Sequence, residues 1–284
     1  MKILVLGANG MAGHVISLYF IKQGYDVYTF TRRSFPYGIN ILGDATNFKE
    51  IANIIKVGNY DYIINCIGIL NQFAEADSLL AKKINSDLPH FLADIISNLP
   101  TRLIQMSTDC VFLGNTGPYY ENSIKDGTTV YDKTKAKGEI IDDKNLTFRN
   151  SIIGPDMKNN GIGLFNWFMK QGDTVNGYTK AMWTGVTTLT LAKAMDRAMQ
   201  TGLTGLYNLV NSSSISKFEL LQLFNKYFCN GNKQIVPFDG FVLDKTLINT
   251  RSDFDFIVPS YEQMIAEMCD WVKEYKEIYK YYYI

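Results

Sequence analysis

The sequence opens with KILVLGANGMAG at positions 2–13, and this stretch decides the fold. The apolar run at 3–6 is typical of a strand buried on both faces of a parallel sheet. Apolar residues at helical spacing over 14–23 predict a helix after the glycine-rich turn. A strand, a glycine turn and a helix in this order predict the first unit of a nucleotide-binding α/β domain.

The three glycines of the turn have separate tasks. Gly7 permits a tight turn, Gly10 lets the backbone approach a pyrophosphate, and Gly13 lets the helix pack closely on the sheet. The N-terminus of the following helix offers free N–H groups and the positive end of a dipole to phosphates. We therefore expect a dinucleotide at this turn, with Asn9 and Met11 among the residues that contact it.

The rest of the chain alternates strand and helix patterns up to about residue 150. Strands are predicted at 26–31, 60–67, 102–107 and 146–151, and helices at 48–57, within 74–98 and at 134–142. This alternation predicts a Rossmann-type, doubly wound and mostly parallel sheet. Beyond it, helices are predicted at 164–170, 189–201, 217–228 and 260–280, and a strand at 206–209. We predict a Rossmann domain at 1–150 and a smaller α/β substrate domain at 151–284, some of whose segments return to the first domain.

The composition excludes several classes of protein. The 284 residues include 28 basic and 28 acidic side chains, and 46% are hydrophobic, which argues against a disordered chain and against a general nucleic-acid binder. Four cysteines without a CxxC pair and two histidines predict neither a disulfide framework nor a zinc site. Because no apolar run could span a membrane or act as a signal peptide, we expect a cytoplasmic protein.

The end of the second predicted strand indicates which cofactor is bound. A carboxylate at this position would bind the ribose 2′-hydroxyl of NAD, but the sequence has Thr31, Arg32 and Arg33. Two guanidinium groups suit the 2′-phosphate of NADPH, unless both are solvated loop residues. Asp44, followed by Ala45, is either a hydrogen-bond acceptor for the adenine amino group or the N-cap of a helix.

Tyr131 and Lys135 are the candidates for acid–base chemistry. Four residues apart, they share one face of a predicted helix. A neighbouring ammonium group lowers the pKa of a phenol, which lets it exchange a proton with a carbonyl oxygen. Ser107 and Thr108 follow a predicted strand at the sheet edge where ligands bind, so a hydroxyl there could bond the same carbonyl.

Taken together, these motifs resemble the extended short-chain dehydrogenase/reductase superfamily. Within it, they are most similar to dTDP-4-dehydrorhamnose reductases and related nucleotide-sugar 4-ketoreductases. The resemblance rests on the segments 7–13, 107–114, 118–122 and 131–139. Cys110, Asp132 and Thr134 depart from the family pattern, which leaves the chemistry intact and the substrate open.

The resemblance implies a role for each matching residue. Tyr131 is the acid/base, Thr108 (or Ser107) is the active hydroxyl, and Lys135 binds the nicotinamide ribose and tunes Tyr131. Other residues are implied on the nicotinamide side of the cofactor or behind it: Cys66, Ile67, Gly68 and Asn85.

Candidate substrate residues are fewer and come mostly from the second half of the chain. Asp109 follows the active hydroxyl. Lys180 could face a diphosphate, and Trp183 could stack on a ring or be a buried core residue. Arg251 could also reach the diphosphate. The segment around Trp183 resembles reductases of UDP-N-acetyl-6-deoxy-4-keto sugars.

The resulting prediction is an NADPH-dependent reductase of a nucleotide-linked 4-keto-6-deoxyhexose for surface polysaccharide synthesis, with NADH less suited as cofactor. It needs no metal and binds no membrane, and a homodimer is conceivable. Two alternatives stay open: an NAD-dependent epimerase or dehydratase of sugar nucleotides, and a non-catalytic NADP(H)-binding regulatory subunit.

Overall fold

The protein is built around a parallel sheet of seven strands in the order β10-β6-β5-β4-β1-β2-β3. A computed structural model describes residues 1–282. Both faces of the sheet are buried, as the alternating residues of β1 show. Ile3 and Val5 belong to the hydrophobic core on one face, and Leu4 and Leu6 belong to the core on the other. The strands are β1 (Lys2–Leu6), β2 (Asp26–Thr31), β3 (Ile39–Leu42), β4 (Tyr62–Asn65), β5 (Arg102–Met106), β6 (Leu146–Arg149) and β10 (Gly205–Asn208).

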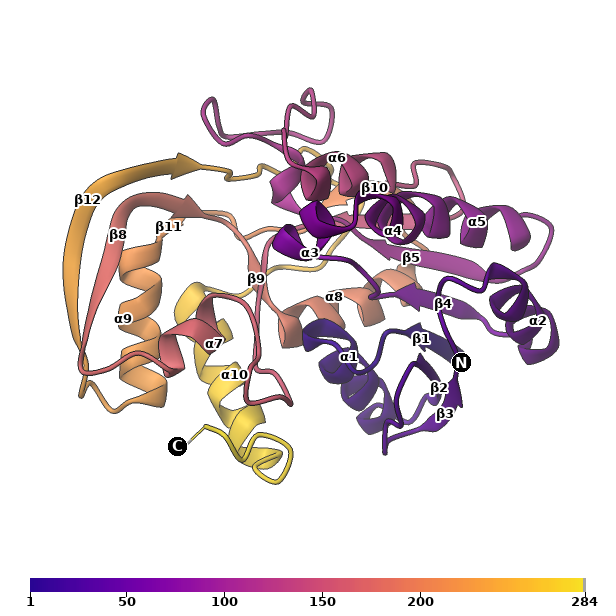
Figure 1. Ribbon diagram of the computed structural model, residues 1–284, viewed down its shortest axis with the longest axis horizontal. Helices are drawn as coiled ribbons and strands as arrows, with labels where there is room; N and C mark the ends of the chain where they lie inside the picture. Colours follow the sequence, from indigo (N-terminus) through magenta and orange to yellow (C-terminus); the bar gives the residue numbers. More distant parts are fainter. Residues whose placement is uncertain (283–284) are drawn as a thin grey trace.

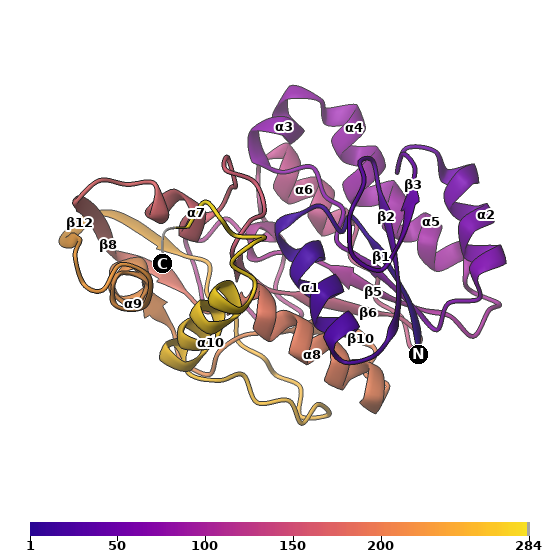
Figure 2. The same ribbon diagram turned by 90° about the horizontal axis from the view of Figure 1, so that it is seen from below.

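Helices cover both faces of this sheet (Figure 2). One face carries α1 (Met11–Lys22) and α8 (Thr188–Thr201), which pack against each other. The other face carries α2 (Phe48–Gly58), α3 (Asn71–Ala76), α4 (Ser78–Lys82), α5 (Leu88–Ile95) and α6 (Val130–Lys137). This arrangement confirms the predicted doubly wound α/β fold.

A smaller layer lies beside the sheet, on the left in Figure 1. Its strands β11 (Ile215–Ser216), β8 (Thr174–Trp183) and β12 (Gln234–Asp244) pack on α9 (Lys217–Phe228). The remaining elements are β7 (Ile152–Ile153), β9 (Val186–Thr187), α7 (Leu164–Met169) and α10 (Tyr261–Glu274). Since α8 and β10 belong to the large sheet's layers, the chain crosses between the two parts more than once. The boundary at residue 150 stays a prediction.

Several predicted elements differ from the structure at their ends. The helix predicted at 134–142 is α6, which begins at Val130 because Thr129 and Asp132 form a capping box. The region 74–98, within which helix is predicted, holds the end of α3, then α4, a π-helical turn at Lys83–Asp87, and α5. The terminal helix ends at Glu274, before residue 280, and β3, β8 and β12 were not predicted.

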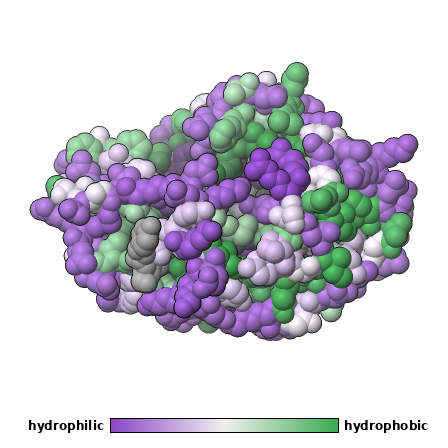
Figure 3. Space-filling view, turned by 60° about the horizontal axis from the view of Figure 1, so that its bottom comes forward, coloured by the Kyte–Doolittle hydropathy of each residue, from purple (hydrophilic) through white to green (hydrophobic). Residues whose placement is uncertain are grey.

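The described surface is mixed in character. Figure 3 shows hydrophilic residues over much of one face, with smaller hydrophobic areas between them. Within residues 1–282, no helix combines the length and apolarity needed to cross a membrane.

Candidate active site

The glycine turn after β1 has the geometry expected of a phosphate-binding loop. Gly7 adopts a φ of +85°, and a Cβ at Gly13 would lie 2.3 Å from the Gly7 carbonyl oxygen, so neither position accepts a side chain. The Gly10 amide donates to the Gly7 carbonyl over 2.9 Å. No side chain caps α1 at Gly10, so its first N–H groups remain available to an anion. Met11, the first residue of α1, is partly exposed.

The end of β2 lies directly against this turn. The Asn9 side chain donates to the Arg33 carbonyl over 2.7 Å, and the Thr31 hydroxyl donates to the same oxygen over 2.7 Å. The backbone is therefore held while the side chains of Arg32 and Arg33 are exposed. Two exposed guanidinium groups beside a phosphate-binding turn fit the 2′-phosphate of NADPH.

Asp44 does not cap the next helix. Its carboxylate accepts from the Thr46 amide over 2.8 Å, and this bond lowers its pKa. Asn47 is the N-cap of α2. Asp44 stays exposed beside buried Ala45, so its predicted contact with adenine stays open.

The end of β4 connects the glycine turn to α6. Ile67 packs so closely on Gly7 that a Cβ there would lie 2.9 Å from the Ile67 side chain. Cys66 lies near Lys135 of α6, and burial raises the pKa of its thiol to about 12. Exposed Gly68 follows Ile67.

Asn85 holds the loop that follows β4 through hydrogen bonds. Its side chain accepts from the Ile69 amide over 2.8 Å and donates to the Ile69 carbonyl over 2.9 Å and to Thr134 over 3.1 Å. Only 1% of Asn85 is exposed. It therefore holds the loop in place from behind the site, and its contact with a cofactor stays a prediction.

Thr108, Tyr131 and Lys135 meet at the carboxyl end of β5. The Lys135 ammonium donates to the Met106 carbonyl over 2.6 Å, and the Cys110 amide donates to the Thr108 hydroxyl over 3.1 Å. Tyr131 is buried beside Thr108 and Cys110. The residues that the sequence singled out for chemistry are thus brought together, at the edge where parallel sheets bind ligands.

The acidity of Tyr131 differs from the prediction. Burial raises the pKa of the phenol above its usual value, the Cys110 thiol raises it further, and a hydrogen bond with Thr108 opposes the rise. The lowered pKa expected from Lys135 is not found, because burial is the largest effect on this phenol and raises its pKa. A raised pKa keeps Tyr131 protonated, which is the form that donates to a developing alkoxide.

Lys135 is also affected by burial. Desolvation lowers the pKa of its ammonium group to about 8, while Glu139 and Cys66 act in the opposite direction. Lys135 is charged at neutral pH and loses its proton in mildly alkaline solution.

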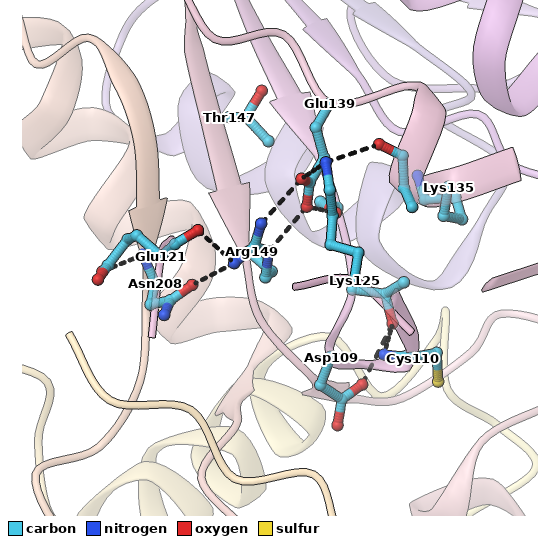
Figure 4. A network of polar contacts seen from close by, with 12 residues as sticks. Asp109, Cys110, Glu121, Lys125, Lys135, Glu139, Thr147, Arg149 and Asn208 are labelled. Atoms are coloured by element: carbon cyan, nitrogen blue, oxygen red, sulfur yellow. Dashed lines mark hydrogen bonds and ion pairs between the residues drawn. The ribbon is translucent and has the colours of Figure 1, made fainter. Parts of the chain in front are cut away.

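A buried ion pair that the sequence did not reveal supports the site from behind (Figure 4). Arg149 at the end of β6 donates twice to Glu139, over 2.7 and 2.8 Å, and both side chains are at most 1% exposed. Glu139 also accepts from the Ser107 hydroxyl over 2.7 Å and from Lys125 over 3.0 Å. Ser107 therefore holds the strand end to this pair and leaves Thr108 as the hydroxyl beside Tyr131. No helical spacing signals the pair, because Glu139 lies beyond the end of α6 at Lys137 and its partner Arg149 is 10 residues further along the chain.

Two predicted substrate residues are structural. Trp183 is 5% exposed and packs on Tyr261 within the main hydrophobic core, so it offers no ring face to a ligand. Arg251 donates to the Thr204 and Leu206 carbonyls at the start of β10, over 2.6 and 2.9 Å. The start of a parallel strand lies at the edge opposite the site, so Arg251 cannot serve a substrate there.

Lys180 lies on the exposed surface of β8. Its ammonium group is 3.7 Å from Asp239 of β12, and 56% of its side chain is exposed. Its predicted contact with a diphosphate stays untested.

Two other lysines, missed by the sequence analysis, lie near the site. Asp109 is desolvated, which raises its pKa, and the charges of Lys245 and Lys217 oppose this rise. Lys245 follows β12 and Lys217 begins α9, so both come from the smaller layer. Sequence spacing gave no signal for them, because only the packing of the two layers brings their charges near Asp109.

Among residues 1–282, no three His, Cys, Asp or Glu side chains are grouped so that they could hold a metal ion.

Comparison with known proteins agrees with this geometry. Residues 1–240 match the family described as RmlD substrate binding domain. The probable low-salt glycan biosynthesis reductase Agl14 of Haloferax volcanii is 24% identical over 230 residues, which cover 76% of each protein. The dTDP-4-dehydrorhamnose reductase of Streptomyces griseus is 30% identical over 138 residues, which cover 48% of this chain and 43% of that protein. This second match spans less than half of either protein.

A solved structure shows the same fold. The dTDP-4-dehydrorhamnose reductase from Bacillus anthracis, in complex with NADP, superimposes with a TM-score of 0.78 at 21% identity. The superposition covers 94% of this chain and 98% of that one. These findings confirm the predicted fold class and the resemblance stated above.

Proposed function

The chain belongs to the family of the RmlD substrate binding domain, and on this premise we propose that it reduces the C4 ketone of a nucleotide-linked 4-keto-6-deoxyhexose with NADPH. The observation that carries the proposal is the meeting of Thr108, Tyr131 and Lys135 at one sheet edge, linked through Cys66 and Ile67 to an uncapped glycine turn. The product would be a 6-deoxysugar donor for surface polysaccharide synthesis.

The described residues fit NADPH. The uncapped N-terminus of α1 would hold the pyrophosphate, Arg32 and Arg33 would hold the 2′-phosphate, and Lys135 would bind the nicotinamide ribose. When bound, NADPH supplies the hydride that the reduction of a ketone requires.

The chain's own residues supply the proton and the orientation. Tyr131, kept neutral by burial, donates its proton to the oxygen on C4 as negative charge develops there. The Thr108 hydroxyl donates a second hydrogen bond to the same oxygen and so stabilises that charge. Lys217 and Lys245 would hold the diphosphate of the substrate, in place of the predicted Arg251.

The direct test is incubation with NADPH and 4-keto-6-deoxy sugars linked to dTDP, UDP or GDP. Loss of NADPH absorbance, with an equal amount of the C4 alcohol formed, supports the reductase. Conversion of a sugar nucleotide without net NADPH consumption would indicate an epimerase or dehydratase. Binding of NADPH without turnover of any substrate would indicate a regulatory subunit.

Replacing Arg32 and Arg33 together by alanine is expected to weaken NADPH binding by about 10- to 100-fold and to leave NADH binding nearly unchanged. Charge-assisted hydrogen bonds to the 2′-phosphate, which NADH lacks, would be lost. Titration with both cofactors measures the effect, and Lys56→Ala, an exposed cation on α2, is the matched control. Equal losses for both cofactors would show that these arginines do not read the 2′-phosphate.

Turnover is expected to fall as the pH rises through about 8. The pKa of Lys135 is lowered to about 8, so its positive charge is present below that pH and is lost above it. Tyr131 does not cause this fall, because burial raises the pKa of its phenol. A pH profile of kcat/KM measures the fall, and Lys135→Arg, which stays charged, should remove it from that pH range. An unchanged profile for Lys135→Arg would assign the fall to another group.

A further inference from the structure

The segment after α10 returns to the glycine turn from the other end of the chain. Tyr279 is 1% exposed, and its hydroxyl lies 2.8 Å from His14 Nε2 in α1. Trp271 Nε1 lies 3.0 Å from the same hydroxyl. His14 Nδ1 lies 2.9 Å from the carbonyl oxygen of Gly10, which ends the glycine turn. His14 and Tyr279, 265 positions apart in the sequence, thus join Gly10 and Trp271 in one continuous chain of hydrogen bonds.

The chemistry of the two ends fixes the direction of every bond. A carbonyl oxygen only accepts, so the proton of neutral His14 must be on Nδ1, which donates to Gly10. Nε2 is then an acceptor, so Tyr279 donates to it, and the Tyr279 oxygen accepts from the indole N–H of Trp271. Burial lowers the pKa of His14 to about 4, so the imidazole is neutral at physiological pH and this arrangement holds.

The Gly10 carbonyl is where this chain of bonds affects the turn. It also accepts from the His14 amide over 3.1 Å, and the Gly10 amide donates to Gly7 over 2.9 Å. Gly10 is therefore held through both its amide and its carbonyl group. It lies immediately before the uncapped N–H groups of α1. A fixed turn binds an anion better, because less conformational freedom is lost on binding.

A second contact of the same segment reaches the first residue of α1. The Tyr282 hydroxyl bonds Asn166, whose amide nitrogen lies 3.9 Å from Met11 Sδ. The Asn166 amide also donates to the Gly154 carbonyl over 3.0 Å. The terminal segment is thus linked to the start of α1 twice, through His14 and through Asn166.

We propose that residues 275–282 hold the phosphate-binding turn in its binding geometry, with Tyr279 and His14 as positioning residues for the pyrophosphate of the dinucleotide. The proposal rests on the proposed function, since it assumes that NADPH binds at this turn. Neither residue touches the cofactor; both act through Gly10.

Tyr279→Phe tests the proposal from the terminal end. The phenyl ring keeps its edge-to-face packing on His14, whose ring centre is 5.6 Å away, and only the hydroxyl is lost. His14 Nε2 is then buried without a donor, and the imidazole no longer holds Gly10 firmly. We expect the NADPH Kd to rise about tenfold, with kcat at saturating cofactor unchanged. Tyr281→Phe, at an exposed tyrosine of the same segment, should bind NADPH like the natural protein.

Two substitutions of His14 test the proposal from the other end. Asparagine places an amide N–H near the position of Nδ1 and can still donate to Gly10, whereas glutamine places its amide near Nε2 and cannot. Each variant breaks the connection at one point, His14→Asn at Tyr279 and His14→Gln at Gly10, so we expect both to lose about tenfold in NADPH affinity. In the His14→Asn background, Tyr279→Phe should have no further effect, because the connection it breaks is already absent.

The outcomes separate this proposal from the proposed function. A natural protein that does not bind NADPH overturns the proposed function. A natural protein that binds NADPH, with Tyr279→Phe binding equally well, overturns only the positioning role. Additive effects in the double variant would likewise overturn it, since they would show that Tyr279 acts by a route other than His14. If Tyr279→Phe does not fold, as judged by circular dichroism, the two His14 variants decide alone: NADPH affinities equal to that of the natural protein overturn the proposal.

Discussion

Tyr131→Phe is expected to lower the turnover of a 4-keto sugar nucleotide by about 10²- to 10⁴-fold, the contribution typical of a positioned general acid. The phenol is buried beside Thr108 and its pKa is raised, so it is protonated throughout the neutral range. Phenylalanine keeps the ring and removes only the proton donor. The NADPH Kd should stay within a few-fold, because the glycine turn and the two arginines are not altered.

The measurement is steady-state NADPH oxidation together with a separate cofactor titration. Tyr281→Phe removes a hydroxyl from an exposed tyrosine and should keep full turnover. A Tyr131→Phe enzyme that retains near-full turnover would mean that another group supplies the proton. Unchanged turnover in Thr108→Val would in addition remove the second hydrogen bond from the proposed mechanism.

The second large effect is expected on stability. Glu139→Gln should lower the free energy of unfolding by about 3–5 kcal/mol, because it leaves the Arg149 guanidinium buried without a counter-charge. The change also weakens the bonds that Glu139 accepts from Ser107 and Lys125. Urea denaturation at neutral pH measures the loss.

Glu262→Gln is the matched control for this substitution. Its ion pair with Lys226 is exposed, with side chains 55% and 61% accessible, so the change should barely alter the free energy of unfolding. An equally small loss for Glu139→Gln would show that the buried pair contributes little to the free energy of unfolding. Replacing Glu139 and Arg149 together by leucine and methionine should recover much of the loss, because no buried charge is left unpaired.

The Glu139–Arg149 pair also has a defined pH dependence. Burial raises the pKa of Glu139, but Arg149, Lys125 and Ser107 outweigh burial, so its pKa is below the usual value. In the folded state Glu139 therefore holds its proton less tightly than in the unfolded chain. Its contribution to stability is complete above the ordinary glutamate pKa and is lost as the pH falls through the lowered value.

The sequence determined the parts of the protein that depend on local order along the chain. The glycine spacing at 7–13, the apolar strand before it and the helix after it were sufficient to predict the nucleotide-binding turn. The strand–helix alternation up to residue 150 predicted the doubly wound sheet. Tyr131 and Lys135 could be paired because residues four apart share one helix face. Thr108 could be added because the carboxyl ends of parallel strands share one edge.

The tertiary structure alone decided everything that depends on burial and on contacts between distant segments. Desolvation raised the pKa of Tyr131 where Lys135, four residues further along the chain, had suggested the opposite. Trp183 and Arg251 are residue types that could bind a sugar nucleotide. Trp183 is buried in the core, however, and Arg251 lies at the edge of the sheet opposite the site. His14 and Tyr279 meet across nearly the whole chain, and Lys217 and Lys245 reach Asp109 from another layer. Such contacts leave no periodic pattern in the sequence, because packing and not spacing along the chain brings the groups together.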